Sequence, residues 1–412
     1  MTDVVVIGAG PAGAMAAGML AQRGYRVRVL ERQTFPRFSI GESLLAQTLQ
    51  LVDEAGMLEA VLSAGFQFKN GAVFLRQDLI SEFNFAEKTS PGYGYTFQVP
   101  RERFDQVLAD EAERMGASIE YEVEVTGMKP GTTPELTCRH KDGHEEIIRP
   151  RYVLDGSGFG RVLPRLLDLH LPSSFPTRAA IFMHVQDRIP SGAFDRQKIR
   201  LYVHPQHWDT WFWVIPFSNG LTSVGVVGDP EVLKRHQGEP RERLWKFIAE
   251  EPNLQELLST AKATERCGEI IGYAAAVKAL HGPGFALLGN AAEFLDPLFS
   301  SGVTIAMKSA HLAVNLIDRE MRGEAVSWDK DFDKPLMLGV ETFRGFISCW
   351  YSGELQDVMF YGKKNLRIRR MICSVLAGYA WDENNPYVGV QSARRVRALS
   401  QTIRQEMQEP TA

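Results

Sequence analysis

Three glycines near the start of the chain have the spacing of a dinucleotide-binding loop. Gly8, Gly10 and Gly13 form the pattern G-x-G-x-x-G directly after the apolar run Val4–Ile7. Glycines at this spacing permit a tight turn and let a pyrophosphate approach the N-terminus of the next helix, whose unpaired N–H groups favour an anion. Glu31 follows where an acidic side chain accepts hydrogen bonds from a ribose. These residues predict a dinucleotide site, and a tight turn without a ligand is the weaker alternative.

A single lysine lies in an apolar stretch of the sequence GFQFKNGAVF. Lys69 has Phe66, Phe68, Ala72 and Phe74 around it. A desolvated ammonium is costly, so a lysine in such a segment needs either a polar cavity or a water-exposed position. Two interpretations follow: a catalytic amine in a cavity, and a surface lysine on a strand. The motifs below favour the first.

Several segments resemble the flavoprotein hydroxylase superfamily and, within it, the flavin-dependent halogenases, over most of the chain to about Gly323. They are the ER, FPR and IGES elements between Glu31 and Ser43, the stretches FQVPRERFD and LDGSGFGR, and the segment LLGNAAEFLDP. By this resemblance the dinucleotide is FAD. The cofactor-binding residues that the resemblance implies are Gly8, Gly10, Ala12, Gly13, Glu31, Arg32, Arg37, Glu42, Ser43, Gln98, Arg101, Asp155, Gly156, Gly289, Asn290, Asp296, Pro297, Gly302 and Val303.

One of these positions departs from the superfamily. Asn290 stands where the superfamily usually has an aspartate that accepts hydrogen bonds from the ribityl hydroxyls of the flavin. An amide keeps one acceptor oxygen and adds two donors. We therefore expect FAD binding to persist with altered geometry.

The segment FLDPLFSSG, from Phe294 to Gly302, fits the halogenase pattern F-x-x-P-x-x-S-x-G at every fixed position. In that family, backbone N–H groups just after this point hold a halide against the flavin, so the resemblance implies a chloride or bromide site at Ser301 and Gly302. Backbone donors at the entry of a helix suit a bare anion. Related flavin reductases and hydroxylases have a similar glycine-rich entry, which leaves that alternative open.

The segment WFWVIP matches the halogenase element W-x-W-x-I-P, with Thr210 where the family usually has glycine. In the family these tryptophans separate the substrate from the flavin. The resemblance thus implies a partition made by Trp211, Trp213, Pro216 and Phe299. Aromatic residues in the core of a sheet are the alternative.

The resemblance also bears on catalysis and substrate. Lys69 coincides with the catalytic lysine of the family, which directs hypohalous acid or holds it as a haloamine. Phe299 stands where tryptophan halogenases carry a glutamate. Phenol and pyrrole halogenases tolerate an apolar residue there, so the expected substrate is an electron-rich phenol or pyrrole, either free or tethered to a carrier protein.

The elements that must position these residues follow from hydrophobic periodicity. A strand at 4–7, a helix at 13–22 and a strand at 26–31 make one βαβ unit, and a second helix is expected at 100–115. Strands are expected at 118–125, 136–139, 146–153 and 285–289, and alternating strands between 179 and 227. A helix is expected at 302–319, and helical structure continues beyond 323.

This pattern predicts an α/β protein. A Rossmann-type FAD-binding domain of the flavoprotein hydroxylase type would comprise residues 1–75, 98–178 and 281–323. An antiparallel-sheet substrate domain would comprise 76–97 and 179–280, and a helical C-terminal region 324–412.

Composition excludes other classes. A formal net charge of −4 provides no basic field for nucleic acid. The four cysteines contain no CxxC pair, which argues against a disulfide framework, and no metal site is predicted. We find no leader before the first strand and no apolar run of roughly 18 residues that could span a membrane. A cytoplasmic protein is therefore expected.

These observations together predict a FAD-dependent halogenase that uses reduced flavin, oxygen and chloride or bromide. A second nucleotide fingerprint for NAD(P)H is not evident, so a separate flavin reductase is expected to supply the reduced flavin. The main rival is a FAD-dependent monooxygenase or dehydrogenase of a lipid or pigment pathway. A flavin-binding sensor would leave Lys69 and the tryptophans without a role.

Overall fold

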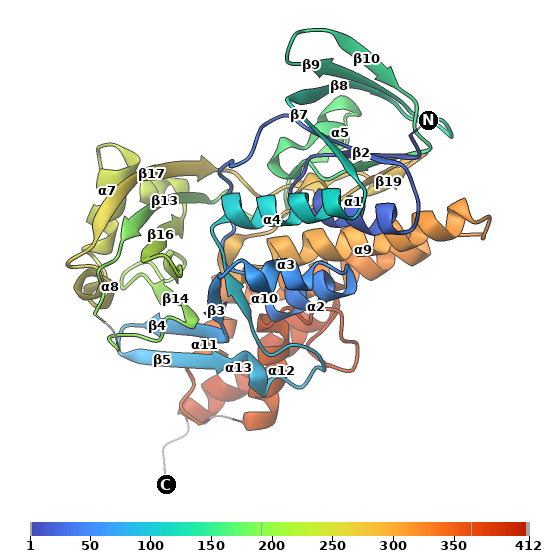
Figure 1. Ribbon diagram of the computed structural model, residues 1–412. Helices are drawn as coiled ribbons and strands as arrows, with labels where there is room; N and C mark the ends of the chain where they lie inside the picture. Colours follow the sequence, from blue (N-terminus) through green and yellow to red (C-terminus); the bar gives the residue numbers. More distant parts are fainter. Residues whose placement is uncertain (1, 191, 364, 409–412) are drawn as a thin grey trace.

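The structure is a computed structural model that describes residues 2–190, 192–363 and 365–408. A six-stranded sheet carries the N-terminal βαβ unit (Figure 1). Its strands in spatial order are β19 (His281–Gly282), β20 (Phe285–Leu287), β11 (Tyr152–Asp155), β1 (Val4–Ile7), β2 (Val27–Glu31) and β7 (Ser118–Tyr121). All neighbours are parallel except β19 and β20. The apolar run of β1 is buried throughout, as a central parallel strand requires.

Three long helices from distant parts of the sequence pack beside this sheet. Helix α1 (Pro11–Gln22) lies between α4 (Arg101–Arg114) and α9 (Gly302–Met321) (Figure 1). Ten consecutive residues of α1, from Pro11 to Leu20, are buried. The small side chains of this helix therefore let two neighbours and the sheet approach it together.

A seven-stranded sheet forms the other main layer. Its strands in spatial order are β17 (Lys262–Ile271), β13 (Ala179–Gln186), β16 (Leu221–Gly228), β15 (Trp211–Pro216), β14 (Lys198–Val203), β4 (Gly71–Arg76) and β5 (Leu79–Asn84). Only β14 and β4 run parallel. The first segment of the predicted FAD-binding domain, 1–75, thus ends inside a strand of this second sheet.

The side chains of β15 alternate between two cores, one of which includes the six-stranded sheet. Phe212 and Val214 belong to a core shared with helix α7 (Pro240–Ile248). Trp211, Trp213 and Ile215 belong to the large core that includes the six-stranded sheet. Successive side chains of a strand point to opposite faces. The two tryptophans of the W-x-W pattern therefore lie on the same face of β15, toward the six-stranded sheet.

Two predicted strands are each broken in the structure. Residue Glu122 has a left-handed backbone (φ 60) and divides the expected strand at 118–125 between β7 and β8. The expected strand at 146–153 is divided between β10 and β11. The smaller sheets are β8 (Val123–Lys129), β9 (Glu135–His140) and β10 (Glu145–Ile148), then β3 (Gln67–Lys69) with β6 (Thr96–Gln98), and β12 (His170–Leu171) with β18 (Ala276–Val277).

The C-terminal region is helical, as predicted. It contains the π-helix η5 (Asp329–Asp333) and helices α10 (Lys334–Tyr351), α11 (Glu354–Phe360), α12 (Leu366–Leu376) and α13 (Ser392–Gln408). The remaining helices are α2 (Ala46–Glu54), α3 (Leu58–Ser63), α5 (Val162–Leu166), α6 (Pro230–Leu233), α8 (Pro252–Leu257), η1 (Phe85–Glu87), η2 (Gly158–Gly160), η3 (Gly289–Ala291) and η4 (Pro297–Phe299). Within the described ranges, no helix is long and apolar enough to cross a membrane.

One tryptophan joins the C-terminal helices to the rest of the molecule. Trp350 of α10 is fully buried, and its ring lies 5.6 Å from that of Phe74 in β4 and 6.3 Å from that of Phe299. The seven-stranded sheet and the segment before α9 therefore meet at this side chain.

We expect Trp350→Ala to lower the free energy of unfolding by about 3–5 kcal/mol, because it removes a large buried side chain from this junction. Urea unfolding measures the change. Trp208→Ala is the control, since Trp208 is 50% exposed and its loss should cost much less. Equal losses for the two variants would contradict the proposed junction.

Candidate functional site

A cavity of about 390 Å³ lies where the six-stranded sheet meets the seven-stranded sheet. Gly8, Arg32 and Gly156, each next after a parallel strand, line one part of it. Trp211 and Trp213 of β15 line another part. Open α/β sheets bind ligands beyond the carboxyl ends of their strands, so the position and size suit a bound organic molecule.

The cavity gathers most of the residues predicted from the sequence. The predicted residues that line it are Gly8, Gly10, Ala12, Glu31, Arg32, Arg37, Glu42, Ser43, Arg101, Gly156, Trp211, Trp213, Asn290, Pro297, Gly302 and Val303. The predicted residues that lie outside its lining are Gly13, Lys69, Gln98, Asp155, Pro216, Gly289, Asp296, Phe299 and Ser301.

The glycine loop divides into packing positions and a ligand position. A Cβ at Gly13 would lie 1.9 Å from the carbonyl oxygen of Gly8, and Gly8 itself has φ +89 beside the backbone of Gly156. A Cβ at Gly10 would meet two side-chain atoms at ordinary contact distance, the Arg37 guanidinium at 3.5 Å and the Asp105 carboxylate at 3.9 Å. Helix α1 begins here without a side-chain cap, so its first N–H groups stay available. Protein contacts do not require glycine at position 10, whereas a pyrophosphate on this helix does.

A charged network lies beside this loop. Glu31 is 5% exposed, and its carboxylate accepts hydrogen bonds from the backbone N–H groups of Ala9 (2.9 Å) and Gln33 (3.0 Å). Arg37 lies 3.4 Å from Glu31 and 3.2 Å from Asp105. The Nε of Arg37 is buried without a partner among the described residues. A bound nucleotide would supply acceptors for that N–H.

Three of the predicted cofactor residues make close contacts within the protein. The buried carboxylate of Asp155 accepts hydrogen bonds from the N–H groups of Ser157 (2.9 Å) and Leu163 (2.7 Å). Gly289 has φ +53, and a Cβ there would lie 2.6 Å from that of Ala306. The side chain of Gln98 donates to the carbonyl oxygen of Arg196 (3.2 Å). These residues shape the cavity wall from behind.

The tryptophan pair is fixed by hydrogen bonds from its indole N–H groups. Trp211 donates to the hydroxyl of Tyr351 and Trp213 to that of Ser223, both at 3.1 Å. Phe299, by contrast, packs edge-on against Phe346 and Trp350. The structure therefore places two of the four predicted partition residues on the cavity, while Pro216 and Phe299 lie outside it.

Asp296 is turned away from the cavity into a buried polar cluster. Its carboxylate accepts hydrogen bonds from the hydroxyls of Tyr351 (2.9 Å) and Tyr273 (3.2 Å) and from the N–H of Leu298 (3.0 Å). Burial, opposed by these hydrogen bonds, raises the pKa of Asp296 to about 6. This residue holds the segment before α9 in place.

The entry to α9 presents backbone donors to the cavity. Ser300 adopts a left-handed conformation (φ 55), Ser301 caps the helix without a side-chain hydrogen bond, and Gly302 and Val303 line the cavity. The first N–H groups of a helix have no partners within it, and its dipole favours an anion. The predicted halide site thus has suitable donors, although Ser301 itself lies behind the lining.

Lys69 is buried directly behind the cavity wall. Its side chain is 1% exposed, and Nζ donates to the hydroxyl of Ser43 (2.7 Å) and the carbonyl oxygen of Leu44 (2.6 Å). Burial lowers the pKa of Lys69 to about 7. The surface-lysine alternative is wrong, and the amine contacts Ser43, which lines the cavity.

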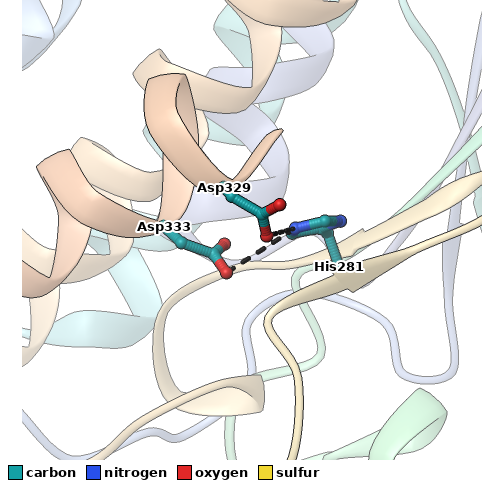
Figure 2. Close-up of side chains that lie close together, drawn as sticks. All are labelled: His281, Asp329 and Asp333. Atoms are coloured by element: carbon teal, nitrogen blue, oxygen red, sulfur yellow. Dashed lines mark hydrogen bonds and ion pairs between the residues drawn. The ribbon is translucent and has the colours of Figure 1, made fainter. Parts of the chain in front are cut away.

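One group of side chains elsewhere could hold a metal. Figure 2 shows His281 of β19 facing Asp329 and Asp333 of η5, with ligand atoms within 4.8 Å of one another. The imidazole lies 3.3 Å from one carboxylate and 3.6 Å from the other. None of the three lines the cavity. A histidine paired with two aspartates accounts for this cluster without a metal.

Several residues that hold the site together were not predicted from the sequence. Asp105 pairs with Arg101 one helical turn away (2.7 Å), and this spacing within FQVPRERFD could have revealed it. Tyr351 bonds to Asp296 across 55 residues. His184 of β13 contacts Glu42 across 142 residues. No local pattern signals such distant pairs.

Comparison with known proteins identifies the family. The family described as FAD binding domain matches residues 1–331. The chain belongs to this family. It is therefore a flavoprotein of the predicted α/β fold, and the open position at Gly10 fits the FAD pyrophosphate.

The curated relatives of this flavoprotein include flavin-dependent halogenases, which confirms the resemblance. A 1H-pyrrole-2-carbonyl peptidyl-carrier-protein chlorinase of Pseudomonas fluorescens is 28% identical over 85% of this chain and 83% of the relative. A tryptophan 2-halogenase of Chondromyces crocatus is 29% identical over 78% of this chain. This chain covers 62% of that second protein, which is longer.

Solved structures give the same fold. A flavoprotein/dehydrogenase from Cytophaga hutchinsonii is 44% identical, with a TM-score of 0.95, and the match covers 99% of this chain and 100% of that one. The myxobacterial chondrochloren halogenase is 27% identical, with a TM-score of 0.74, over 98% of this chain and 96% of that one.

We expect Gly10→Val to lower FAD affinity strongly while the protein stays folded, because the new side chain enters the ligand position without meeting protein backbone. Fluorescence titration with FAD and circular dichroism measure the two effects. Gly13→Val is the contrasting variant, since its Cβ would collide with the Gly8 carbonyl and disrupt folding. Unchanged FAD affinity in Gly10→Val would contradict the site.

We expect Asp296 to make the FAD-free protein less stable as pH rises. Its folded pKa of about 6 exceeds the ordinary value of 3.8, so stability falls between these two pH values and stays lower above them. The decline should be about 3 kcal/mol, since one pKa unit corresponds to about 1.4 kcal/mol. Asp296→Asn should lack it in urea unfolding from pH 4 to 7.5. Parallel profiles for the two proteins would refute the assignment.

Proposed function

We propose that this flavoprotein is a FAD-dependent halogenase. It would use reduced flavin, oxygen and chloride or bromide to halogenate an electron-rich phenol or pyrrole. The observation that carries the proposal is Lys69, a fully buried amine with a pKa of about 7 that is hydrogen-bonded to the cavity wall. Bound FAD supplies the oxygen activation, and the residues of this chain bind it and handle the halogen.

The lysine is suited to carry electrophilic halogen because half or more of it is neutral at and above pH 7. A neutral amine reacts with hypohalous acid to form a haloamine and water, and only the unprotonated form has the lone pair that this step needs. The haloamine then transfers its halogen to the ring carbon, and the proton displaced from that carbon returns to the nitrogen. Ser43 and Leu44 hold Nζ beside the cavity, from which it would have to turn toward the substrate.

The entry of α9 is proposed as the halide site. Gly302 and Val303 line the cavity at this point. The 20-residue helix α9 begins here, so the positive end of its dipole faces the site. A halide held at this point would lie in the cavity beside the bound flavin. Asn290, which also lines the cavity, offers amide donors where the superfamily has a carboxylate.

The substrate proposal rests on Phe299 and on the relatives. Phe299 is 4% exposed against Phe346 and Trp350, an environment that excludes a carboxylate polarising an indole. The chlorinase relative is named for a pyrrole on a carrier protein. We therefore favour a phenol or pyrrole ring, with a carrier-bound substrate as one form.

The partners and the organisation of the chain complete the proposal. A separate flavin reductase would supply reduced flavin. Four free cysteines fit a reducing cytoplasm. The proposed FAD-binding, substrate and C-terminal units keep the predicted ranges, except that β4 joins the seven-stranded sheet.

A FAD-dependent dehydrogenase or reductase is the second candidate. The 44% identical structure from Cytophaga hutchinsonii carries the name flavoprotein/dehydrogenase. Such an enzyme would turn over without halide. A halogenase depends on halide and releases a brominated product when supplied with bromide, and mass spectrometry distinguishes the two.

We expect Lys69→Ala to abolish halogenated product, by on the order of 10²–10⁴-fold or more, while oxygen consumption by the reduced flavoprotein continues. Lys69→Arg should fail similarly, because guanidinium stays protonated and forms no haloamine. Product formation by the parent should rise with pH through about 7, as the amine loses its proton.

Lys308→Ala is the matched control, because burial also lowers the pKa of Lys308, which lies outside the cavity lining. This variant should halogenate at the parent rate. Full activity in Lys69→Ala would remove the catalytic residue and favour the dehydrogenase.

A further inference from the structure

Glu42 has one carboxylate oxygen with a partner and one without. The residue is 1% exposed and lines the cofactor cavity. Its Oε1 lies 2.6 Å from Nε2 of His184. Its Oε2 is buried and has no hydrogen-bond partner among the described residues. A buried oxygen without a donor is energetically unfavourable, so we expect a donor to meet it in the FAD-bound protein.

His184 is itself held firmly. It lies on β13, is 5% exposed, and its ring packs edge-on against Phe38 (6.1 Å) and Phe217 (5.4 Å). Besides these ring contacts, the imidazole of His184 forms a hydrogen bond with Glu42. His184 does not line the cavity. Any effect it has on a ligand must therefore pass through Glu42.

The position of Glu42 along the cavity selects the part of FAD that it meets. By the dinucleotide-binding pattern, Glu31 would meet the ribose and Gly10 the pyrophosphate. Glu42 instead contacts β13 of the seven-stranded sheet, which also carries Trp213, whereas Glu31 ends β2 of the six-stranded sheet. The groups of FAD that remain for this end are the ribityl chain and the isoalloxazine ring. Both carry donors, as hydroxyls and as ring N–H.

We propose that His184 is a positioning residue that fixes the Glu42 carboxylate so that Oε2 accepts a hydrogen bond from a ribityl hydroxyl or ring N–H of FAD. The Nε2 contact at 2.6 Å orients the carboxylate, and the aromatic neighbours keep the imidazole from turning. The inference rests on the FAD site of the proposed function and is independent of halogenation.

The test is the FAD dissociation constant of purified protein, measured by fluorescence titration. Glu42→Gln should weaken binding roughly 10- to 100-fold, because a hydrogen bond to a charged group is worth about 1.5–3 kcal/mol. His184→Leu should weaken it about tenfold, and His184→Gln, which keeps a donor, should restore much of the loss. The double variant Glu42→Gln/His184→Leu should bind no worse than Glu42→Gln alone, since His184 acts through Glu42.

His204→Leu is the matched control. His204 is also a buried histidine of the seven-stranded sheet region paired with a glutamate, Glu250 at 2.7 Å, but neither residue lines the cavity. Its FAD affinity should equal that of the parent. The visible spectrum of bound flavin separates the two donors: a ring N–H bonded to Glu42 predicts shifted bands in Glu42→Gln, and a ribityl hydroxyl predicts none.

Three results would overturn the inference. Unchanged FAD affinity in Glu42→Gln would mean that no FAD donor meets Oε2. Additive losses in the double variant would mean that His184 acts by another route. If His184→Leu only lowers the melting temperature of the FAD-free protein and leaves affinity intact, its role is structural and the positioning role is refuted. Loss of halogenation with normal FAD binding would instead concern only the proposed function.

Discussion

The cavity exists because one face of the seven-stranded sheet packs across the carboxyl ends of the parallel strands. Period-two alternation along β15 sends Trp211 and Trp213 into this contact and Phe212 to the opposite core. The parallel strands deliver the glycine loop and Glu31 to the same place from the other side. A flavin enclosed between the two sheets would be shielded from water by the sheets themselves.

Enclosure has an electrostatic consequence for the two polar groups behind the wall. Desolvation lowers the pKa of Lys69 to about 7 and raises that of Asp296 to about 6. The same physical cause therefore moves an amine and a carboxylic acid toward neutrality in opposite directions.

Local patterns in the sequence predicted the parts of the fold and site that depend on short-range constraints. The glycine spacing, the βαβ unit and the W-x-W alternation are dictated by backbone geometry within a few residues, and all three are found in the structure. The distant hydrogen-bond partners of buried carboxylates could not be predicted from local sequence patterns. Asp296 accepts hydrogen bonds from the hydroxyls of Tyr273 and Tyr351, which lie 23 and 55 residues away in the chain, and no local pattern predicts these contacts. At Glu122 the chain passes from the six-stranded sheet to the three-stranded sheet, and no local pattern predicts this break either.

The burial of Asp296 also bears on how a halide could be held at α9. An ionised carboxylate five residues before Ser301 would oppose an anion at the helix entry, since charges a few ångströms apart interact strongly in a low dielectric. Hydrogen bonds from Tyr273, Tyr351 and Leu298 hold the carboxylate outside the cavity lining. The raised pKa reduces the charge further near pH 6. Tyr351 belongs to α10 and also accepts the Trp211 indole N–H, so one hydroxyl links the C-terminal helices to Asp296 and to Trp211. The C-terminal region is thus part of the site even though none of its residues lines the cavity.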